Sequence, residues 1–339
     1  MKDYFQLIRY KNLIFIIAVQ WIMHHCIVLP ILTTFGIGDY ALNTNLLWLI
    51  IFATVFIAAG GYAINDYFDT KIDLLNRPNR QIVGRTITKR TASWIHHITT
   101  AIGVLLGLFV SWKLKSLSLC FIFLMTPGLL WFYSASYKRM PFLGNFIISL
   151  CTALAPILIA LANGEVLQTN YSPELLMQTP ILPTIYTWIL GFSGFAFILS
   201  MIRETIKDME DEYGDKENEC RTLPVVFGIS KTKWILYSYI VLFIALLIWS
   251  YVSFVQDFAL FKTIDEFYSL RFIICGLIVP ILLLTYFIWK AKTPTEFHSC
   301  SICTKIIMII GLAYSFLFYF LIAKANGLAL FGIFFVNPQ

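Results

Sequence analysis

Long apolar segments follow one another along almost the whole of this 339-residue chain. Each is close to the length of about 20 residues that an α-helix needs to cross a bilayer. We expect spans at about residues 13–35, 46–64, 92–112, 117–133, 142–162, 184–202, 234–254, 272–289 and 306–323. Continuous runs of this kind differ from the short alternating segments of a transmembrane β-barrel. The sequence therefore predicts an all-α, polytopic membrane protein with nine transmembrane helices.

The composition agrees with this class. Hydrophobic residues make up 59% of the chain and charged residues only 13%, and the mean hydropathy is +0.77. This balance excludes a disordered chain and is untypical of a soluble domain. Residues 1–11 are polar, and the first apolar run has no small-residue cleavage pattern, so we expect a retained span instead of a signal peptide.

Basic residues are distributed unevenly among the connections. If the connections alternate between two sides, most of the 25 Lys and Arg residues lie on the side of the N-terminus. Basic loops are retained in the cytoplasm. The N-terminus and the mouth of the cavity are therefore predicted to be cytoplasmic, and the C-terminus is predicted on the opposite side.

Two acidic motifs stand where apolar runs end on that predicted cytoplasmic side. Each has three aspartates at i, i+3 and i+7, which share one face of a helix. The two triads are Asp66, Asp69 and Asp73, and Asp208, Asp211 and Asp215. Ionisable groups at membrane depth are energetically costly and normally mark a functional site. Glu204, Glu210 and Glu212 are expected to lie off this ladder as surface charges.

A weak internal repeat connects the two motifs. Each is followed by a basic loop that contains proline and then by a glycine, at 76–84 and again at 221–228. We expect one domain over residues 1–339, with a first acidic half at about 12–162 and a second at about 184–325. Both loops are then expected over one shared mouth.

Clustered carboxylates repel one another unless a cation neutralises them. Oxygen ligands favour Mg²⁺, which commonly binds one or two carboxylates together with substrate phosphates. The two triads can therefore hold Mg²⁺ around a diphosphate. Basic side chains near the motifs are candidates for the remaining phosphate oxygens, namely Arg77, Arg80, Arg203, Lys207 and Arg221. For Arg77, Arg80 and Arg221 an anchoring role in topology is an equal alternative.

A diphosphate at the mouth of a membrane cavity implies a ligand with an apolar tail. Polyprenyl diphosphates have this form. Loss of the diphosphate leaves an allylic cation, which aromatic faces can stabilise, and Phe, Trp and Tyr make up 17% of the chain. Mg²⁺ would offset the charge on the departing diphosphate.

The motifs resemble those of a known family. Residues 65–73 (Asn-Asp-Tyr-Phe-Asp-Thr-Lys-Ile-Asp) resemble the NDxxDxxxD signature of the UbiA superfamily of intramembrane prenyltransferases, and residues 208–215 resemble its DxxDxxxD signature. The resemblance implies a nine-helix bundle around a central cavity, in which all six aspartates bind Mg²⁺ and Asn65 contacts the diphosphate. It also implies transfer of the prenyl group to a lipophilic acceptor from the same cavity.

A third segment, residues 133–145, is similar to the family's Tyr, Lys and Gly-Asn segment after the fourth span. Its Gly-Asn ending looks more like the branch that contains digeranylgeranylglyceryl phosphate synthase and chlorophyll synthase than like the hydroxybenzoate enzymes. The resemblance implies phosphate contacts for Lys138 or Arg139 and substrate binding for Asn145. Tyr137 is expected to steer the cation, although Tyr is also common at membrane interfaces.

The leading hypothesis is Mg²⁺-dependent transfer of a polyprenyl group, geranylgeranyl by the branch resemblance, to a geranylgeranylglyceryl phosphate-type lipid. An aromatic quinone precursor or a tetrapyrrole is an alternative acceptor. A more distant alternative is a cation-coupled transporter, but its acids would be expected near mid-span beside broken helices. Membrane lipids surround the protein, and no nucleic-acid partner is expected because no recognition motif is present.

Overall fold

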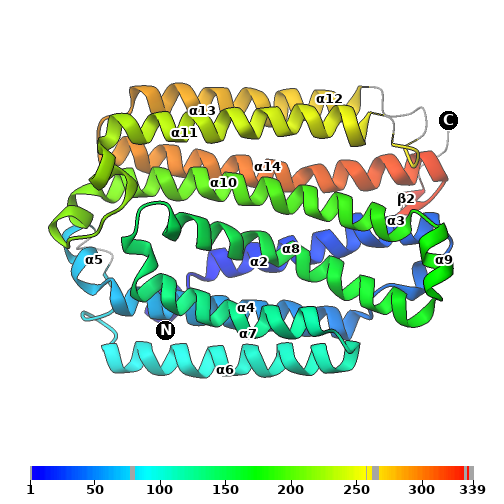
Figure 1. Ribbon diagram of the computed structural model, residues 1–339, viewed down its shortest axis with the longest axis horizontal. Coiled ribbons are helices and arrows are strands. Elements are labelled where there is room, and N and C mark those ends of the chain that lie inside the picture. Colours follow the sequence, from blue (N-terminus) through cyan, green and yellow to red (C-terminus); the bar gives the residue numbers. More distant parts are fainter. Residues whose placement is uncertain (1, 77–80, 257, 262–266, 332–333, 336–339) are drawn as a thin grey trace.

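The computed structural model describes residues 2–76, 81–256, 258–261, 267–331 and 334–335. Its long helices run side by side along the long axis of the molecule (Figure 1). They are α2 (Tyr10–Ile22), α4 (Thr44–Phe68), α6 (Lys89–Leu114), α7 (Leu117–Ala135), α8 (Leu143–Asn170), α10 (Ile181–Glu217), α11 (Leu223–Ser250), α13 (Val279–Lys290) and α14 (Pro294–Asn326).

Shorter elements extend or connect these helices. Turns of π-helix, Met23–Val28, Tyr251–Val255 and Phe272–Ile278, continue or precede α2, α11 and α13, and α3 (Leu29–Thr34) completes the first span. The other short helices are α1 (Lys2–Leu7), α5 (Thr70–Asn76), α9 (Pro173–Gln178), α12 (Tyr268–Arg271) and the 3₁₀ turns Gly38–Tyr40 and Tyr137–Arg139. A two-residue antiparallel ladder joins β1 (Ala329–Leu330) to β2 (Phe334–Phe335), with Ala329 opposite Phe335.

The prediction of nine spans is confirmed: over the described ranges, nine helical segments are long and apolar enough to cross a membrane. Their charged ends depart from the predicted limits. Helix α10 continues to Glu217 instead of ending at 202, and α14 begins at Pro294 instead of 306. Hydropathy marks only the apolar part of a helix, whereas helical hydrogen bonding continues into the polar ends. The connection expected at 163–183 is likewise shorter, because α8 continues to Asn170.

Both acidic motifs lie at the same end of the bundle. In Figure 1 this is the end of α5 and of the C-terminal half of α10. Helix α10 packs against α8, α11 and α14, and α4 packs closely against α6. The second motif is therefore carried by a helix inside the bundle, and the first by the end of α4 and by α5, which also contacts α10.

Glycines allow the close packing of α4 on α6. A Cβ atom at Gly103 in α6 would lie 2.8 Å from the carbonyl oxygen of Ala53 and 2.9 Å from the backbone nitrogen of Ile57. Across the same seam, the ring Nδ1 of His96 lies 3.0 Å from the carbonyl oxygen of Gly60. Small residues at such positions let helix backbones approach in a membrane, where packing replaces the hydrophobic driving force.

We predict that Gly103→Leu lowers the stability of the protein by about 1–3 kcal/mol, because the new side chain would overlap the backbone of α4. The thermal unfolding midpoint of the purified protein in detergent measures this effect. Gly128→Leu in α7 is the matched control, since a Cβ at Gly128 meets open space. Equal midpoints for the two variants would contradict the close packing described here.

Candidate functional site

A cavity of about 1640 Å³ lies within the bundle, and all six aspartates of the two triads line it. Ligand pockets commonly have volumes of about 300–1,000 Å³. This cavity is larger, so it has room for more than one ligand. The predicted convergence of the triads on one space is therefore what the structure shows.

The first triad spans a break between two helices. Helix α4 ends at Phe68, and the N–H of Asp69 still donates to the carbonyl of Asn65 at 3.0 Å before α5 begins at Thr70. The side-chain amide of Asn65 donates to Asp69 Oδ2 at 2.8 Å. The assumption of one continuous helix is thus wrong in detail, but the near-helical path still directs Asp66, Asp69 and Asp73 into the cavity.

Cations from distant segments neutralise this triad. Arg9 forms an ion pair with Asp66 at 2.9 Å, and its guanidinium lies 5.0 Å from the centre of the Tyr62 ring. Lys138 forms an ion pair with Asp69. Burial lowers the pKa of Lys138 to about 7, and the contact with Asp69 opposes that shift by favouring the ammonium form.

Asn145 restrains the second triad. Its amide donates to Asp208 Oδ2 at 2.8 Å. It can do so because the preceding residue is glycine: a Cβ at Gly144 would lie 2.8 Å from the Cα of Lys138, so only glycine lets α8 start directly against the 137–139 turn. Farther along α10, the hydroxyl of Thr222 donates to Asp215 Oδ2 at 3.1 Å. The Gly-Asn segment thus has a clear structural role.

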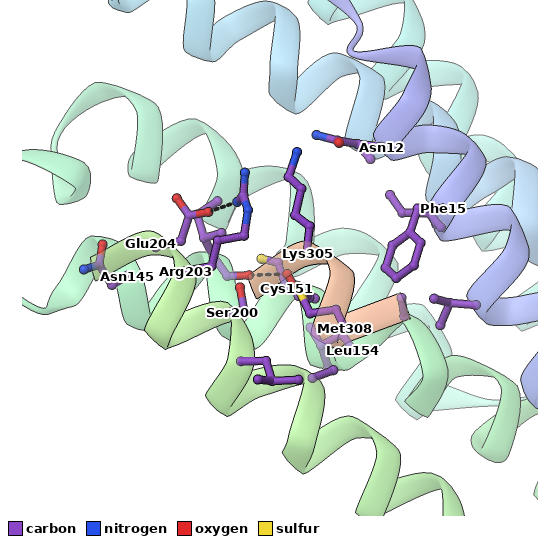
Figure 2. A pocket seen from close by; sticks show the side chains of 18 of the residues that line it. Asn12, Phe15, Asn145, Cys151, Leu154, Ser200, Arg203, Glu204, Lys305 and Met308 are labelled. Carbon is purple, nitrogen blue, oxygen red and sulfur yellow. Dashed lines mark hydrogen bonds and ion pairs between the residues drawn. The ribbon is translucent and has the colours of Figure 1, made fainter. Parts of the chain in front are cut away.

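Glu204 is part of the cavity wall, so its assignment as a surface charge was wrong. It is 7% exposed and forms an ion pair with Arg203 (Figure 2). It also accepts a hydrogen bond from Lys207 Nζ at 3.0 Å. Helical spacing could have revealed this position, because Glu204 lies four residues before Asp208 on the same face.

Glu210 was also misassigned as a surface charge. Its side chain is 9% exposed, it lines the cavity, and its carboxylate pairs with His298 Nδ1 of α14 at 3.0 Å. Glu212 is half-buried and does not line the cavity.

Several predicted site residues lie elsewhere. The ring of Tyr137 stacks on Phe132, with centroids 5.9 Å apart, and Tyr133 lines the cavity in its place. Arg139 and Arg221 are exposed and do not line the cavity. They are joined through the backbone, where the N–H of Arg221 donates to the carbonyl of Arg139 at 2.8 Å.

The remaining predicted residues either line the cavity or lie outside the described part of the chain. Those that line it are Asn65, Lys138, Asn145, Arg203 and Lys207. Arg77 and Arg80 lie outside the described residues. Among the residues whose placement is described, no three His, Cys, Asp or Glu side chains form a metal-binding cluster by themselves.

Comparison with known proteins gives the family. The model of the UbiA prenyltransferase family matches residues 27–264. The chain belongs to the UbiA prenyltransferase family. Together with the apolar helices, this makes it an integral, multi-pass membrane protein.

Relatives within the family share part of the sequence and the whole fold. The chain is 32% identical to digeranylgeranylglyceryl phosphate synthase of Pyrococcus horikoshii over 185 residues, which cover 54% of this chain and 57% of that protein. The match thus spans little more than half of that relative. A solved structure of digeranylgeranylglyceryl phosphate synthase superimposes with a TM-score of 0.59 at 23% identity, covering 94% of this chain and 98% of that one. The structure of a UbiA homologue from Archaeoglobus fulgidus bound to DMAPP and Mg²⁺ superimposes with a TM-score of 0.53 at 17% identity, covering 92% of this chain and 98% of that one.

We predict that Glu204→Gln destabilises this UbiA-family protein by about 3–5 kcal/mol, the usual consequence of leaving buried charges without a partner. Lys207→Met added to Glu204→Gln should restore part of that stability, because one unpaired cation is then removed. Thermal unfolding midpoints of the two single variants and the double variant form a mutant cycle. Glu212→Gln is the control. A loss of stability in Glu212→Gln equal to that in Glu204→Gln would argue against the ion-pair explanation.

Proposed function

We propose that this protein transfers a polyprenyl group from its diphosphate to a lipophilic acceptor in the membrane, with Mg²⁺ as cofactor. The observation that carries the proposal is that one cavity is lined both by the two aspartate triads and by a long stretch of apolar side chains. The family membership supports it. So does the homologue bound to DMAPP and Mg²⁺, because DMAPP is a prenyl diphosphate.

The side chains of the second triad fit a divalent cation. Asp208 and Asp215 receive hydrogen bonds from the neutral groups of Asn145 and Thr222, and neither forms an ion pair with another described residue. Two carboxylates satisfied only by neutral donors leave negative charge for a cation to balance. Asp66, Asp69, Asp73, Asp208, Asp211 and Asp215 would hold Mg²⁺, each ion bound by one or two carboxylates and by phosphate oxygens. Bound Mg²⁺ would stabilise the negative charge of the leaving diphosphate.

Basic and amide side chains at the mouth of the cavity bind the diphosphate itself. Lys138 and Lys207 supply charge-assisted hydrogen bonds, and Asn65 supplies an amide donor. Arg9 joins them from the N-terminal segment, where it already contacts Asp66. Lys138 and Arg9 hold carboxylates in the structure, so they can turn to phosphate oxygens when Mg²⁺ takes over those carboxylates.

The apolar wall binds the prenyl chain and excludes water from the reacting carbon. The cavity lining extends from Asp208 to Trp188, about 30 Å along α10. Phe192, Phe243 and Tyr314 contribute further aromatic faces to it. Such faces stabilise a cation, and Tyr133 offers one close to the triads.

For the finer assignment, we propose that the donor is geranylgeranyl diphosphate and the acceptor a geranylgeranylglyceryl phosphate-type lipid. The similarity to digeranylgeranylglyceryl phosphate synthases supports this choice over an aromatic quinone precursor or a tetrapyrrole. We also propose that the mouth of the cavity faces the cytoplasm, as the distribution of basic residues indicates.

Asp66→Asn and Asp208→Asn should each reduce prenyl transfer by at least about 100-fold, because each removes a carboxylate that would hold the Mg²⁺ that stabilises the developing negative charge on the diphosphate. The measurement follows labelled geranylgeranyl diphosphate into lipid, using the protein in liposomes with extracted membrane lipids as acceptors. Asp39→Asn is the control, since Asp39 is exposed and lies outside the cavity lining. EDTA should abolish transfer, and equal transfer with EDTA and with Mg²⁺ would remove the metal from the mechanism.

Gly194→Leu should shift the preference of the enzyme towards shorter donors. Gly194 lines the cavity about 21 Å along α10 from Asp208, and a Cβ there meets open space. The added side chain would therefore occupy the tail end of the cavity without disturbing the diphosphate end. We expect kcat/KM for geranylgeranyl diphosphate to fall by about 10-fold or more relative to kcat/KM for geranyl diphosphate. Gly128→Leu is the control. If Gly194→Leu left the ratio of the two kcat/KM values unchanged, the prenyl chain would lie elsewhere.

A further inference from the structure

A second group of charged residues lies deeper in the cavity than the aspartates. Helices α10 and α14 pack against each other and run in opposite directions (Figure 1). The contact of Glu210 with His298 fixes their register. Seven residues farther into the bundle on each helix, about 10 Å, lead to Arg203 and Lys305. Because seven residues are close to two turns, both side chains stay on the facing sides.

Lys305 points into the cavity. The residues of α14 that line the cavity recur every three or four positions, and Lys305 belongs to this stripe together with Ser301 and Met308. Figure 2 shows Lys305 and Arg203 projecting into the same space. Helix α14 begins at Pro294, so Lys305 lies about 16 Å from the start of the helix, where its polar part meets the apolar run expected from residue 306. The side chain of Lys305 is exposed and borders the cavity.

This deeper group carries more positive than negative charge. Glu204 is shared between Arg203 and Lys207. Within the described part of the chain, no carboxylate forms an ion pair with Lys305, and Nε of Arg203 has no hydrogen-bond partner. The nearby Arg9 adds no negative charge and is itself paired with Asp66. Cations without a carboxylate partner at the wall of a cavity are available to pair with an anion that enters it.

The diphosphate of the donor does not account for this surplus. Its proposed site is at the triads, where Lys138, Lys207 and Arg9 are available, and Arg203 lies about 7 Å deeper along α10 than Asp208. The cavity has room for a second ligand beside the donor. With Lys207 left to the diphosphate, Arg203 and Lys305 exceed Glu204 by one positive charge. A phosphate monoester carries close to two negative charges at pH 7 and would offset that excess.

We propose that Arg203 and Lys305 form an anion subsite that binds the phosphate monoester headgroup of the acceptor lipid. As an acceptor site, this inference rests on the proposed prenyl transfer. It moves Arg203 from the donor diphosphate, to which the sequence assigned it, to the acceptor. It also makes Lys305 a residue that determines acceptor specificity by charge.

Direct binding tests the subsite without any chemistry. Octyl phosphate is titrated calorimetrically into the full-length protein in a neutral detergent, with octanol and octanoate as comparison ligands. We expect saturable binding of octyl phosphate, at least 10-fold weaker binding of octanoate, and none of octanol. Saturating geranylgeranyl thiolodiphosphate with Mg²⁺ should leave octyl phosphate binding intact, because the two anions occupy different positions.

Variants of Lys305 provide the decisive comparison. Lys305→Met and Arg203→Met should each weaken octyl phosphate binding at least 10-fold, whereas Lys305→Arg should retain it. Lys290→Met is the matched control, because both lysines are exposed but Lys290 lies outside the cavity lining. Removal of an uncompensated cation should leave the thermal unfolding midpoint of Lys305→Met unchanged or raise it, which separates loss of binding from loss of fold.

Three results would overturn the subsite: no binding by the unmodified protein, equal binding by Lys305→Met, or displacement of octyl phosphate by the thiolodiphosphate. The transfer assay separates this outcome from failure of the proposed function. In that assay Lys305→Met should raise KM for a phosphate-bearing acceptor and leave KM for the donor unchanged. Transfer with a change only in the donor KM refutes the subsite alone. Octyl phosphate binding that depends on Lys305, without any transfer, refutes the prenyltransferase assignment and leaves the anion site standing.

Discussion

Compensation of charge inside an apolar bundle is the constraint on which this structure depends. Each buried carboxylate must meet a cation or a set of donors, because its solvation by water has been lost. The first triad meets cations of the protein, Arg9 at Asp66 and Lys138 at Asp69. The second triad meets neutral donors at Asp208 and Asp215. The side of the cavity formed by α10 therefore has the greater need for an external cation, while the side formed by α4 can exchange a protein cation for one.

The sequence predicts the features that depend on local pattern. Apolar length gives the number of spans, and the spacing of the triads places three acids on one helix face. Prediction from the sequence fails where the position of a side chain depends on contact between segments that are distant in the chain. Arg9, which pairs with Asp66, has a positive φ of 51°. This conformation is typical of glycine, so an arginine in the sequence gives no sign of it. Lys305 is in the cavity because of the register between α10 and α14, and hydropathy contains no information about that register. The internal repeat stays a prediction.

The segment after the fourth span shows how neighbouring residues can differ in role. Tyr137, Lys138 and Arg139 form one 3₁₀ turn, so consecutive side chains point in different directions. Lys138 therefore faces Asp69, while Arg139 is exposed and the ring of Tyr137 lies against Phe132. Gly144 brings α8 against this turn and so places Asn145 at Asp208. This segment thus connects the first triad, through Lys138, to the second, through Asn145.

Two layers of opposite charge follow from these contacts, with aspartates towards the mouth and a surplus of cations deeper along α10 and α14. A donor diphosphate and an acceptor phosphate repel each other strongly in a medium of low dielectric constant. In the proposed arrangement, the acidic layer with its Mg²⁺ binds the first anion and the basic layer binds the second. Glu204 lies between them, paired with Arg203 on one side and Lys207 on the other. Such alternation allows two substrates with anionic headgroups to lie side by side, with the reacting carbon of the donor near the acceptor, while each headgroup is neutralised by its own layer.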